Sequence, residues 1–378
     1  MHLYLHIPFC KQACHYCDFH FSTNLKSKAD MVAAICQELV LQKNYLSTSN
    51  LKTIYLGGGT PSLLSEAEFG QIFETIHCLY DVENGAEITI EANPDDLTPE
   101  KIQILRHFAN RLSIGIQSFH APYLQQMNRA HTAEQSQNCV KHAQDAGFEN
   151  LTIDLMYGIP QQTDYLAAAH IWQQDLEKAV ALQVPHISSY NLTIEPKTAF
   201  WTWLKKGQIL PADEAISVNQ FESLIGYLTQ NQYEHYEISS FAKAGWHARH
   251  NSSYWRRRSY LGVGPSAHSF NGTSRQYNVA NNAQYIKAIN AQKVPFEREE
   301  LSPYNQVNDY LLTSLRTMWG CDLRVLHDIL KGEIPASFHK LITEYVDSEF
   351  LILENQVLYL TPKGKLFADR IASDLFLI

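Results

Sequence analysis

The first half of the chain alternates short apolar runs with longer segments in which apolar residues recur at helical spacing. This alternation is typical of parallel βα units, in which each strand is followed by a helix that packs back on the sheet. The pattern predicts six strands, at Leu3–Ile7, Thr53–Leu56, Glu87–Glu91, Arg111–Gln117, Asn150–Met156 and His186–Leu192.

Capping signals mark the helices between these strands. Apolar residues at helical spacing predict a helix over Lys28–Tyr45. Ser65 followed by Glu68 matches a capping box, and Thr98 followed by a proline matches an N-cap with Pro at the first helical position. A further helix is expected over Thr132–Ala146, ending at the glycine that follows it.

Six such units predict an α/β fold, namely a partial (β/α)6 TIM-like barrel with its active loops at the C-terminal ends of the strands. A full eight-unit barrel is the alternative, but the pattern weakens after about Leu192. From about Pro303 the order changes to three helical runs, two short strands and a last helix, which resembles a winged helix. We therefore expect a core domain over 1–235, a connecting region over 236–300 and a C-terminal winged-helix-like α+β domain over 301–378.

Composition excludes several classes of partner. Lys and Arg number 30 against 39 Asp and Glu, a formal net charge of −9, which disfavours nucleic acid or an anionic membrane as a general partner. Residues 301–378 hold 7 basic and 10 acidic side chains, so DNA is not their expected target. No run approaches the roughly 18 apolar residues of a transmembrane segment, and the N-terminal stretch lacks the basic start of a signal peptide. Seven cysteines without such a signal favour a reducing, cytoplasmic location.

Three of those cysteines form a metal-binding pattern. Cys10, Cys14 and Cys17 are spaced CxxxCxxC directly after the first predicted strand. Thiolates are soft ligands that suit iron–sulfur clusters and zinc, and three ligands leave one iron of a cluster open. Zinc is the alternative, with His15 or His20 as a fourth ligand.

The spacing, with the Tyr-x-His-x-Pro-Phe-Cys sequence that opens at Tyr4, resembles the radical S-adenosylmethionine (SAM) superfamily. The resemblance implies a [4Fe-4S] cluster on the three cysteines, SAM on the fourth iron, and an electron donor that reduces the cluster. Glycines and polar residues near the ends of successive predicted strands match the SAM site of that superfamily, although a glycine triplet alone is more often a simple turn. The SAM-binding residues implied are Tyr4, Gly58, Gly59, Thr60, Glu91, Gln117, Arg129 and Asp154.

A second motif, residues 250–255, reads His-Asn-Ser-Ser-Tyr-Trp and matches the HNxxYW haem-binding motif of the HemW group of haem chaperones. A neutral imidazole is a good axial ligand for haem iron, and aromatic rings offer a surface for the macrocycle. The arginines at 256–258 could pair with the haem propionates. The haem-binding residues implied are His250, Asn251, Tyr254 and Trp255, with another of the 17 histidines as the alternative ligand.

Two functions compete within this branch of the superfamily. Oxygen-independent coproporphyrinogen III oxidases decarboxylate propionates to vinyl groups, whereas the HemW group carries haem to acceptor proteins. Phe19 stands where the oxidases have a fourth cysteine, and the chain begins only three residues before Tyr4, so the oxidases' N-terminal extension is expected to be absent. With the haem motif, these features favour a haem chaperone. The oxidase is the alternative, a radical enzyme acting on another tetrapyrrole is the third hypothesis, and the role of SAM cleavage is left open.

Overall fold

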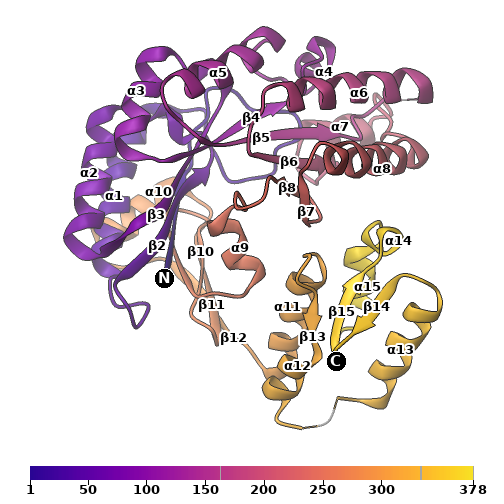
Figure 1. The fold of residues 1–378 in the computed structure, drawn as a ribbon. Helices are drawn as coiled ribbons and strands as arrows, with labels where there is room; N and C mark the ends of the chain where they lie inside the picture. The colour runs from indigo at the N-terminus through magenta and orange to yellow at the C-terminus, as the bar shows by residue number, and fades with distance from the viewer. Residues whose placement is uncertain (162, 333, 378) are drawn as a thin grey trace.

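The computed structural model describes residues 1–161, 163–332 and 334–377. Within these residues, six parallel strands form the centre of one large sheet, in the order of the chain (Figure 1). All six predicted strands are confirmed; the third begins six residues earlier than predicted, and the other ends shift by at most three residues. Their bounds are β1 His2–Ile7, β2 Asn50–Gly58, β3 Asp81–Ala92, β4 Arg111–Gln117, β5 Asn150–Tyr157 and β6 His186–Asn191.

Shorter strands extend this sheet at both edges. Beyond β6 lie β8 Ser240–Ala242 and β7 Glu234–Glu237, both antiparallel. Beyond β1 lies β9 Tyr260–Val263, which is parallel to β1, followed by the antiparallel β10 His268–Phe270, β11 Ser274–Asn278 and β12 Phe296–Glu300. The barrel therefore stays open and the eight-unit alternative does not form. Most of these added strands come from residues 236–300, and they pair with backbone groups that would otherwise be exposed at the edges of the six-stranded centre.

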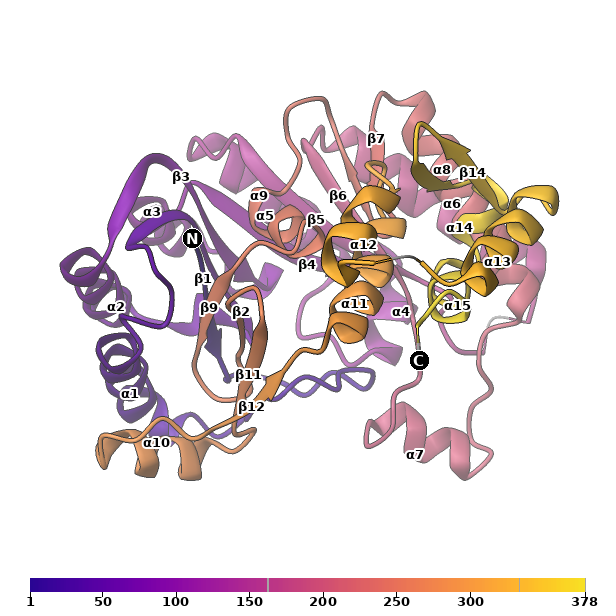
Figure 2. The ribbon, with the colours of Figure 1, turned by 90° about the horizontal axis from the view of Figure 1, so that it is seen from below.

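Helices cover the outer face of the six parallel strands (Figures 1 and 2). Ser65 and Glu68 form the expected capping box, and the hydroxyl of Thr98 accepts the Lys101 amide. The first helix ends at Leu41, four residues earlier than predicted, because the chain closes a turn there with the Tyr45 amide on the Gln42 carbonyl, 2.8 Å. The bounds are α1 Lys28–Leu41, α2 Glu66–Leu79, α3 Pro99–Phe108, α4 Ala121–Gln126, α5 Ala133–Asp145, α6 Tyr165–Ala181, α7 Ala199–Lys205, α8 Glu214–Gln230, α9 Arg249–Trp255 and α10 Asn282–Asn290.

The last part of the chain forms a separate small lobe in Figure 1. The two predicted strands form here as β14 and β15, and the short β13, which the sequence did not predict, adds a third strand to give the antiparallel order β13-β15-β14. Apolar residues such as Val307, Leu326 and Leu358 give this lobe a core of its own. Its elements are α11 Pro303–Leu315, β13 Cys321–Asp322, α12 Leu323–Leu330, α13 Ala336–Asp347, β14 Leu351–Glu354, β15 Val357–Leu360, α14 Pro362–Lys365 and α15 Ala368–Asp374.

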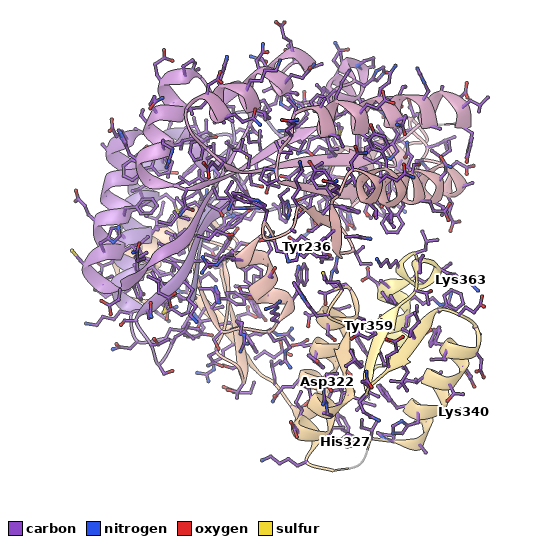
Figure 3. The ribbon with its side chains drawn as sticks, viewed as in Figure 1. Tyr236, Asp322, His327, Lys340, Tyr359 and Lys363 are labelled. Carbon is purple, nitrogen blue, oxygen red and sulfur yellow. The ribbon has the colours of Figure 1, made fainter. Side chains whose placement is uncertain are left out.

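Backbone and side-chain contacts hold this lobe against the main sheet. In Figure 3, Tyr236 lies at the junction while Lys340 and Lys363 lie on the outside of the lobe. The carbonyl of Tyr236 accepts the Met318 amide at 2.9 Å. Beside it, the Arg316 guanidinium donates to the buried Glu237 carboxylate at 2.8 Å. Within the described residues, no helix has the length and apolarity needed to cross a membrane.

Candidate functional site

The cysteine loop follows β1 and is tied down by backbone hydrogen bonds. The Cys10 amide donates to the Ser22 carbonyl at 3.1 Å, and the His15 amide donates to the Met127 carbonyl at 3.1 Å. Cys10, Cys14 and Cys17 are each half-buried, and none is in a disulfide. The loop is thus held between the end of β1 and the segment that follows α4.

Two donors point at the sulfurs of this loop. The Thr60 hydroxyl lies 3.4 Å from Cys10 Sγ, and Arg129 Nη1 lies 3.2 Å from Cys14 Sγ. Burial raises the pKa of Cys10 to about 11 and that of Cys17 to about 12, so a metal that binds these groups as thiolates must displace protons. In the part of the chain that the structure describes, no three His, Cys, Asp or Glu side chains are grouped closely enough to hold a single metal ion.

The two histidines considered as a fourth zinc ligand are engaged elsewhere. His15 Nδ1 lies 2.9 Å from the Gln126 carbonyl oxygen, and its ring packs edge-on against Trp203. His20 Nε2 lies 2.7 Å from the Asn282 side-chain oxygen. Each ring therefore has one nitrogen engaged by a residue outside the cysteine loop.

The glycine loop after β2 packs directly on the cysteine loop. The Gly59 amide donates to the Ile7 carbonyl at 2.9 Å, and the Thr60 amide donates to the Phe9 carbonyl at 2.7 Å. A Cβ on Gly59 would lie 2.6 Å from both of those carbonyl oxygens. Gly58 has a φ of +101°, and a Cβ there would lie 2.4 Å from the His6 ring. Only glycine fits this close approach of two backbones.

Two carboxylates lie near the ends of β3 and β5. Glu91 accepts the Tyr55 hydroxyl at 2.7 Å and the Gly58 amide at 3.1 Å. Desolvation raises its pKa to about 7, and desolvation also raises the pKa of Asp154 to about 6. The buried guanidinium of Arg111 opposes both shifts. A positively charged ligand group bound beside Glu91 or Asp154 would therefore favour the ionised form of that carboxyl group.

Arg129 joins the strand ends to the cysteine loop. Besides Cys14, its guanidinium donates to the Asn93 side chain at 2.6 Å and to the Gly115 carbonyl at 2.7 Å. Gln117, which ends β4, has a φ of 69°, and its side-chain oxygen is buried without a hydrogen-bond partner among the described residues. Such an orphaned acceptor is uncommon and suits a ligand donor. Tyr4 completes the set, with its hydroxyl 3.1 Å from His6 Nδ1.

His250 of the HNxxYW segment is buried on α9, and both of its ring nitrogens have partners. Nδ1 lies 2.6 Å from the Thr53 hydroxyl of β2, and Nε2 lies 2.7 Å from the Tyr254 hydroxyl. The His250 amide donates to the Glu87 carboxylate at 2.8 Å. An iron ligand at His250 would have to give up one of its ring hydrogen bonds.

The other three motif residues have different surroundings. Tyr254 lines a cleft, whereas the Trp255 ring packs under the guanidinium of Arg316 at 4.5 Å. Asn251 is half-buried. Of the arginines that follow, Arg256 stacks on Trp319 at 4.0 Å and lines a second cavity of about 810 Å³, whereas Arg258 lines both this cavity and the cleft.

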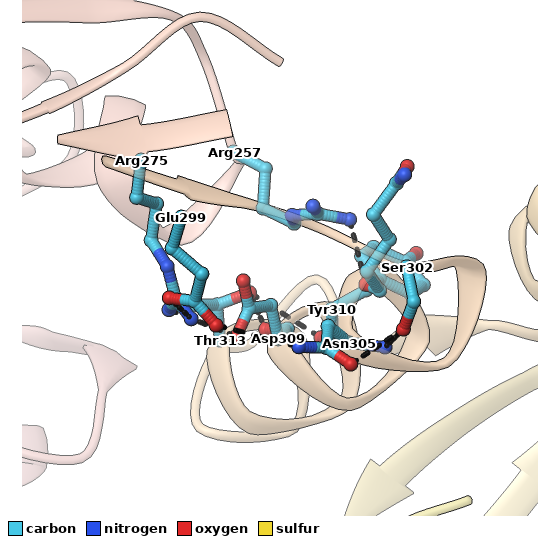
Figure 4. A network of polar contacts seen from close by, with 9 residues as sticks. Arg257, Arg275, Glu299, Ser302, Asn305, Asp309, Tyr310 and Thr313 are labelled. Atoms are coloured by element: carbon cyan, nitrogen blue, oxygen red, sulfur yellow. Dashed lines mark hydrogen bonds and ion pairs between the residues drawn. The ribbon is translucent and has the colours of Figure 1, made fainter. Parts of the chain in front are cut away.

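The cleft beside Tyr254 has a volume of about 560 Å³. One end is formed by the residues after the last cysteine of the loop, including Phe19, whose side chain is 68% exposed. Asp309 of α11 also lines the cleft, and Arg275 of β11 pairs with this carboxylate at 3.2 Å and with Glu299 of β12 at 2.9 Å (Figure 4). Further lining residues are His20, Arg257, Arg258, Tyr260, His268 and Phe270. Burial and the charge of Arg275 lower the pKa of His268.

Sequence reasoning missed residues that organise this site. Asn93 bonds both Arg129 and the Thr60 hydroxyl, and Tyr55 bonds Glu91. Their places near the ends of β3 and β2 were a usable signal, because polar side chains there face the same end of a parallel sheet. His268, by contrast, gave no sequence signal, since a turn-rich region did not predict its strand.

Comparisons with known proteins identify relatives of this chain. Residues 4–167 match the family model described as the radical SAM superfamily. The chain is 34% identical to heme chaperone HemW of Lactococcus lactis over 96% of this chain and 93% of that protein. It is 32% identical to heme chaperone HemW of Bacillus subtilis over 97% of each.

The fold is also that of a solved structure. Coproporphyrinogen III oxidase (HemN) from Escherichia coli, described as a radical SAM enzyme, aligns with a TM-score of 0.84 at 22% identity, covering 99% of this chain and 89% of that one. At that identity the likeness establishes the fold alone. Given the sequence identities over nearly its whole length, the chain belongs to the HemW family of the radical SAM superfamily.

Proposed function

We propose that this protein binds haem and passes it to acceptor proteins, and that it carries a [4Fe-4S] cluster and SAM at its strand ends. The observation that carries the proposal is the cleft of about 560 Å³, which Phe19 beside the cysteine loop and Tyr254 of the HNxxYW segment line together. Its volume falls within the range of about 300–1,000 Å³ typical of ligand sites. The printed names of the curated relatives supply haem as the cargo.

The cysteine loop suits a cluster. Three thiols on one anchored loop, with the Thr60 hydroxyl and the Arg129 guanidinium aimed at two of the sulfurs, supply ligands and hydrogen bonds of the kind that tune iron–sulfur centres. When bound, such a cluster supplies single electrons, which requires an electron donor as a partner. Because all seven cysteines are free, we also infer a cytoplasmic site of action.

The strand ends suit SAM. The amides of Gly58, Gly59 and Thr60 already have partners, so the SAM amino group, which is a donor, would be received by loop carbonyls or by Glu91. Arg129 would pair with the carboxylate, and the unpaired oxygen of Gln117 would accept a further donor. Tyr4 and Asp154 complete the proposed SAM-binding set.

In the haem site, we assign Tyr254 to the cleft wall and His250 to holding Tyr254 in place. The 2.7 Å contact between His250 Nε2 and the Tyr254 hydroxyl supports this division. Asn251 and Trp255 would act from the same helix, Trp255 through its contact with Arg316. The alternative function, decarboxylation of coproporphyrinogen III, has no residue in the cleft that favours it over haem binding.

The cluster is tested by anaerobic reconstitution and by iron and sulfide analysis. We expect about four of each per chain, with their loss when Cys10, Cys14 and Cys17 are replaced by Ser. Cys78→Ser, at an exposed single cysteine, is the matched control and should keep the cluster. Retention of zinc, or a cluster indifferent to the triple replacement, would reject the assignment.

The SAM site is tested by electron paramagnetic resonance of the reduced cluster. SAM should perturb the spectrum, and Glu91→Ala should weaken that effect, whereas Glu100→Ala on the exposed face of α3 should not. A spectrum that SAM leaves unchanged would count against the site.

Haem binding is tested by titrating hemin into the reconstituted protein. Tyr254→Phe and His250→Ala should weaken binding while leaving iron and sulfide content unchanged, because the two sites use different residues. His107→Ala, at an exposed histidine of α3, is the control. The proposal fails if the wild-type protein shows no saturable haem binding.

A further inference from the structure

We propose that His268, outside the HNxxYW segment, is the residue of this chain that ligates the haem iron in the cleft. The inference rests on the proposed function, since it assumes that the cleft is where haem binds. It assigns a role to a residue on the short edge strand β10, which the sequence left without one.

The histidine of the HNxxYW motif is poorly placed to be the ligand. His250 is 1% exposed and lines neither the cleft nor the second cavity. Both ring nitrogens are within 2.7 Å of a hydroxyl oxygen. Coordination through Nε2 would leave the Tyr254 hydroxyl without this partner, which costs about 1–3 kcal/mol. Coordination through Nδ1 would break the contact with the Thr53 hydroxyl, which would keep its contact with His2 Nδ1 at 2.9 Å.

Three histidines line the cleft, and their rings differ in availability. His6 has both nitrogens in contacts, with the Tyr4 hydroxyl at 3.1 Å and the His20 carbonyl oxygen at 2.8 Å. His20 uses Nε2 on Asn282 at 2.7 Å. The ring of His268 has no hydrogen bond from any described residue, and its neighbour is the Tyr277 ring at a centroid distance of 5.6 Å. Among the described residues, His268 is therefore the cleft histidine with neither ring nitrogen in a hydrogen bond, so it can bind iron through either nitrogen, whereas His20 has one nitrogen engaged.

The surroundings of His268 suit a flat, hydrophobic ligand with anionic edges. Phe270 lies two residues along the same strand, so both side chains project from the same face of β10. Tyr254 and Tyr260 add aromatic surface to the cleft, their ring centroids 4.6 Å apart. Aromatic faces of this kind pack well on a macrocycle.

Arg258 is the cation best placed to receive a propionate. It is exposed, lines the cleft and takes part in no ion pair among the described residues. Arg275 is already neutralised by Glu299 and Asp309. Arg257 donates to the Gln306 carbonyl at 2.8 Å and lies over Phe270, so it contributes to the cleft wall (Figure 4).

The test is hemin titration of the reconstituted protein, with axial ligation read by resonance Raman and electron paramagnetic resonance, because the cluster also absorbs near the main haem band. His268→Ala should change the ligation spectrum and weaken binding by about tenfold or more. Added imidazole should restore the wild-type spectrum. His339→Ala, at an exposed histidine outside the cleft, is the control and should leave ligation unchanged. His268→Gln serves if the alanine variant does not fold.

The outcomes separate this inference from the function on which it rests. If the wild-type protein binds no haem, both fail. If the wild-type protein binds haem and His268→Ala keeps its ligation spectrum and affinity, the function stands and the assignment of His268 is wrong. If His20→Ala or His250→Ala alters the axial-ligation spectrum and His268→Ala does not, the assignment of His268 is also wrong.

Discussion

Replacing Gly59 by Ala tests how tightly the glycine loop must pack on the cysteine loop. A Cβ at this position would lie 2.6 Å from the carbonyl oxygens of Ile7 and Phe9 and 2.7 Å from the Phe9 amide nitrogen. All three atoms belong to backbone, so no side-chain rotation relieves the clash. The two loops must separate instead, directly beside Cys10.

The expected loss in the free energy of unfolding can be estimated from the contacts that break when the glycine loop and the cysteine loop separate. The hydrogen bonds from the Gly59 amide to Ile7 and from the Thr60 amide to Phe9 would lengthen, at about 1 kcal/mol each. Overpacking itself costs about 1–3 kcal/mol. We therefore expect a loss of about 3–5 kcal/mol, which is a large part of the 5–15 kcal/mol typical of a folded domain.

The assay is urea unfolding of the protein without its cluster, followed by iron analysis after reconstitution. Gly70→Ala in α2 is the matched control, because a Cβ there has no neighbour within 4 Å, and alanine in a helix should stabilise by up to about 1 kcal/mol. Gly59→Ala should lower both the unfolding midpoint and the iron content. A Gly59→Ala protein with the wild-type midpoint and full iron loading would refute the reasoning.

Three further predictions concern the scaffold. Thr53→Val leaves His250 Nδ1 buried without its partner and should cost about 1–3 kcal/mol in urea unfolding without lowering iron content. Burial raises the pKa of Glu38 from 4.5 to about 7, so its contribution is full below pH 4.5 and is lost as pH rises through 7; Glu38→Gln should flatten the pH dependence of the urea midpoint in that window, and an unchanged slope would contradict this. Glu237→Gln removes the buried carboxylate that pairs with Arg316 at 2.8 Å and leaves the exposed Asp369, at 3.9 Å, as its ion-pair partner; it should cost about 1–3 kcal/mol, detected as faster proteolysis of the C-terminal lobe, and unchanged cleavage would count against the contact.

Much of the fold could be predicted because local patterns and tertiary packing agree. The parallel strands are apolar runs buried under helices, and the caps at Ser65 and Thr98 depend only on residues three positions away. Edge strands such as β10 were not predicted, because three residues are too few to show alternation. Those strands form because the sheet edge beside them supplies hydrogen-bond partners.

The candidate site also has parts that the sequence predicts and parts that depend on tertiary packing. The cysteine loop and strand ends could be predicted, since the carboxyl ends of parallel strands meet at one end of the sheet. The position of His250 could not, because Thr53 is 197 residues away in sequence. The motif suggests a ligand, whereas the two hydrogen bonds of its ring place it inside the scaffold. Likewise, the cleft depends on α11 packing beside β11 and β12, which only the assembled fold provides.

The most direct test of the central claim follows the porphyrin in one preparation. Reconstituted protein, loaded with haem and supplied with SAM and reductant, is mixed with an apo-haem protein and with coproporphyrinogen III, and both porphyrins are quantified by chromatography. Our account predicts that haem moves to the acceptor while coproporphyrinogen III is unchanged. Conversion of coproporphyrinogen III to protoporphyrinogen IX, with haem left on the protein, would contradict it.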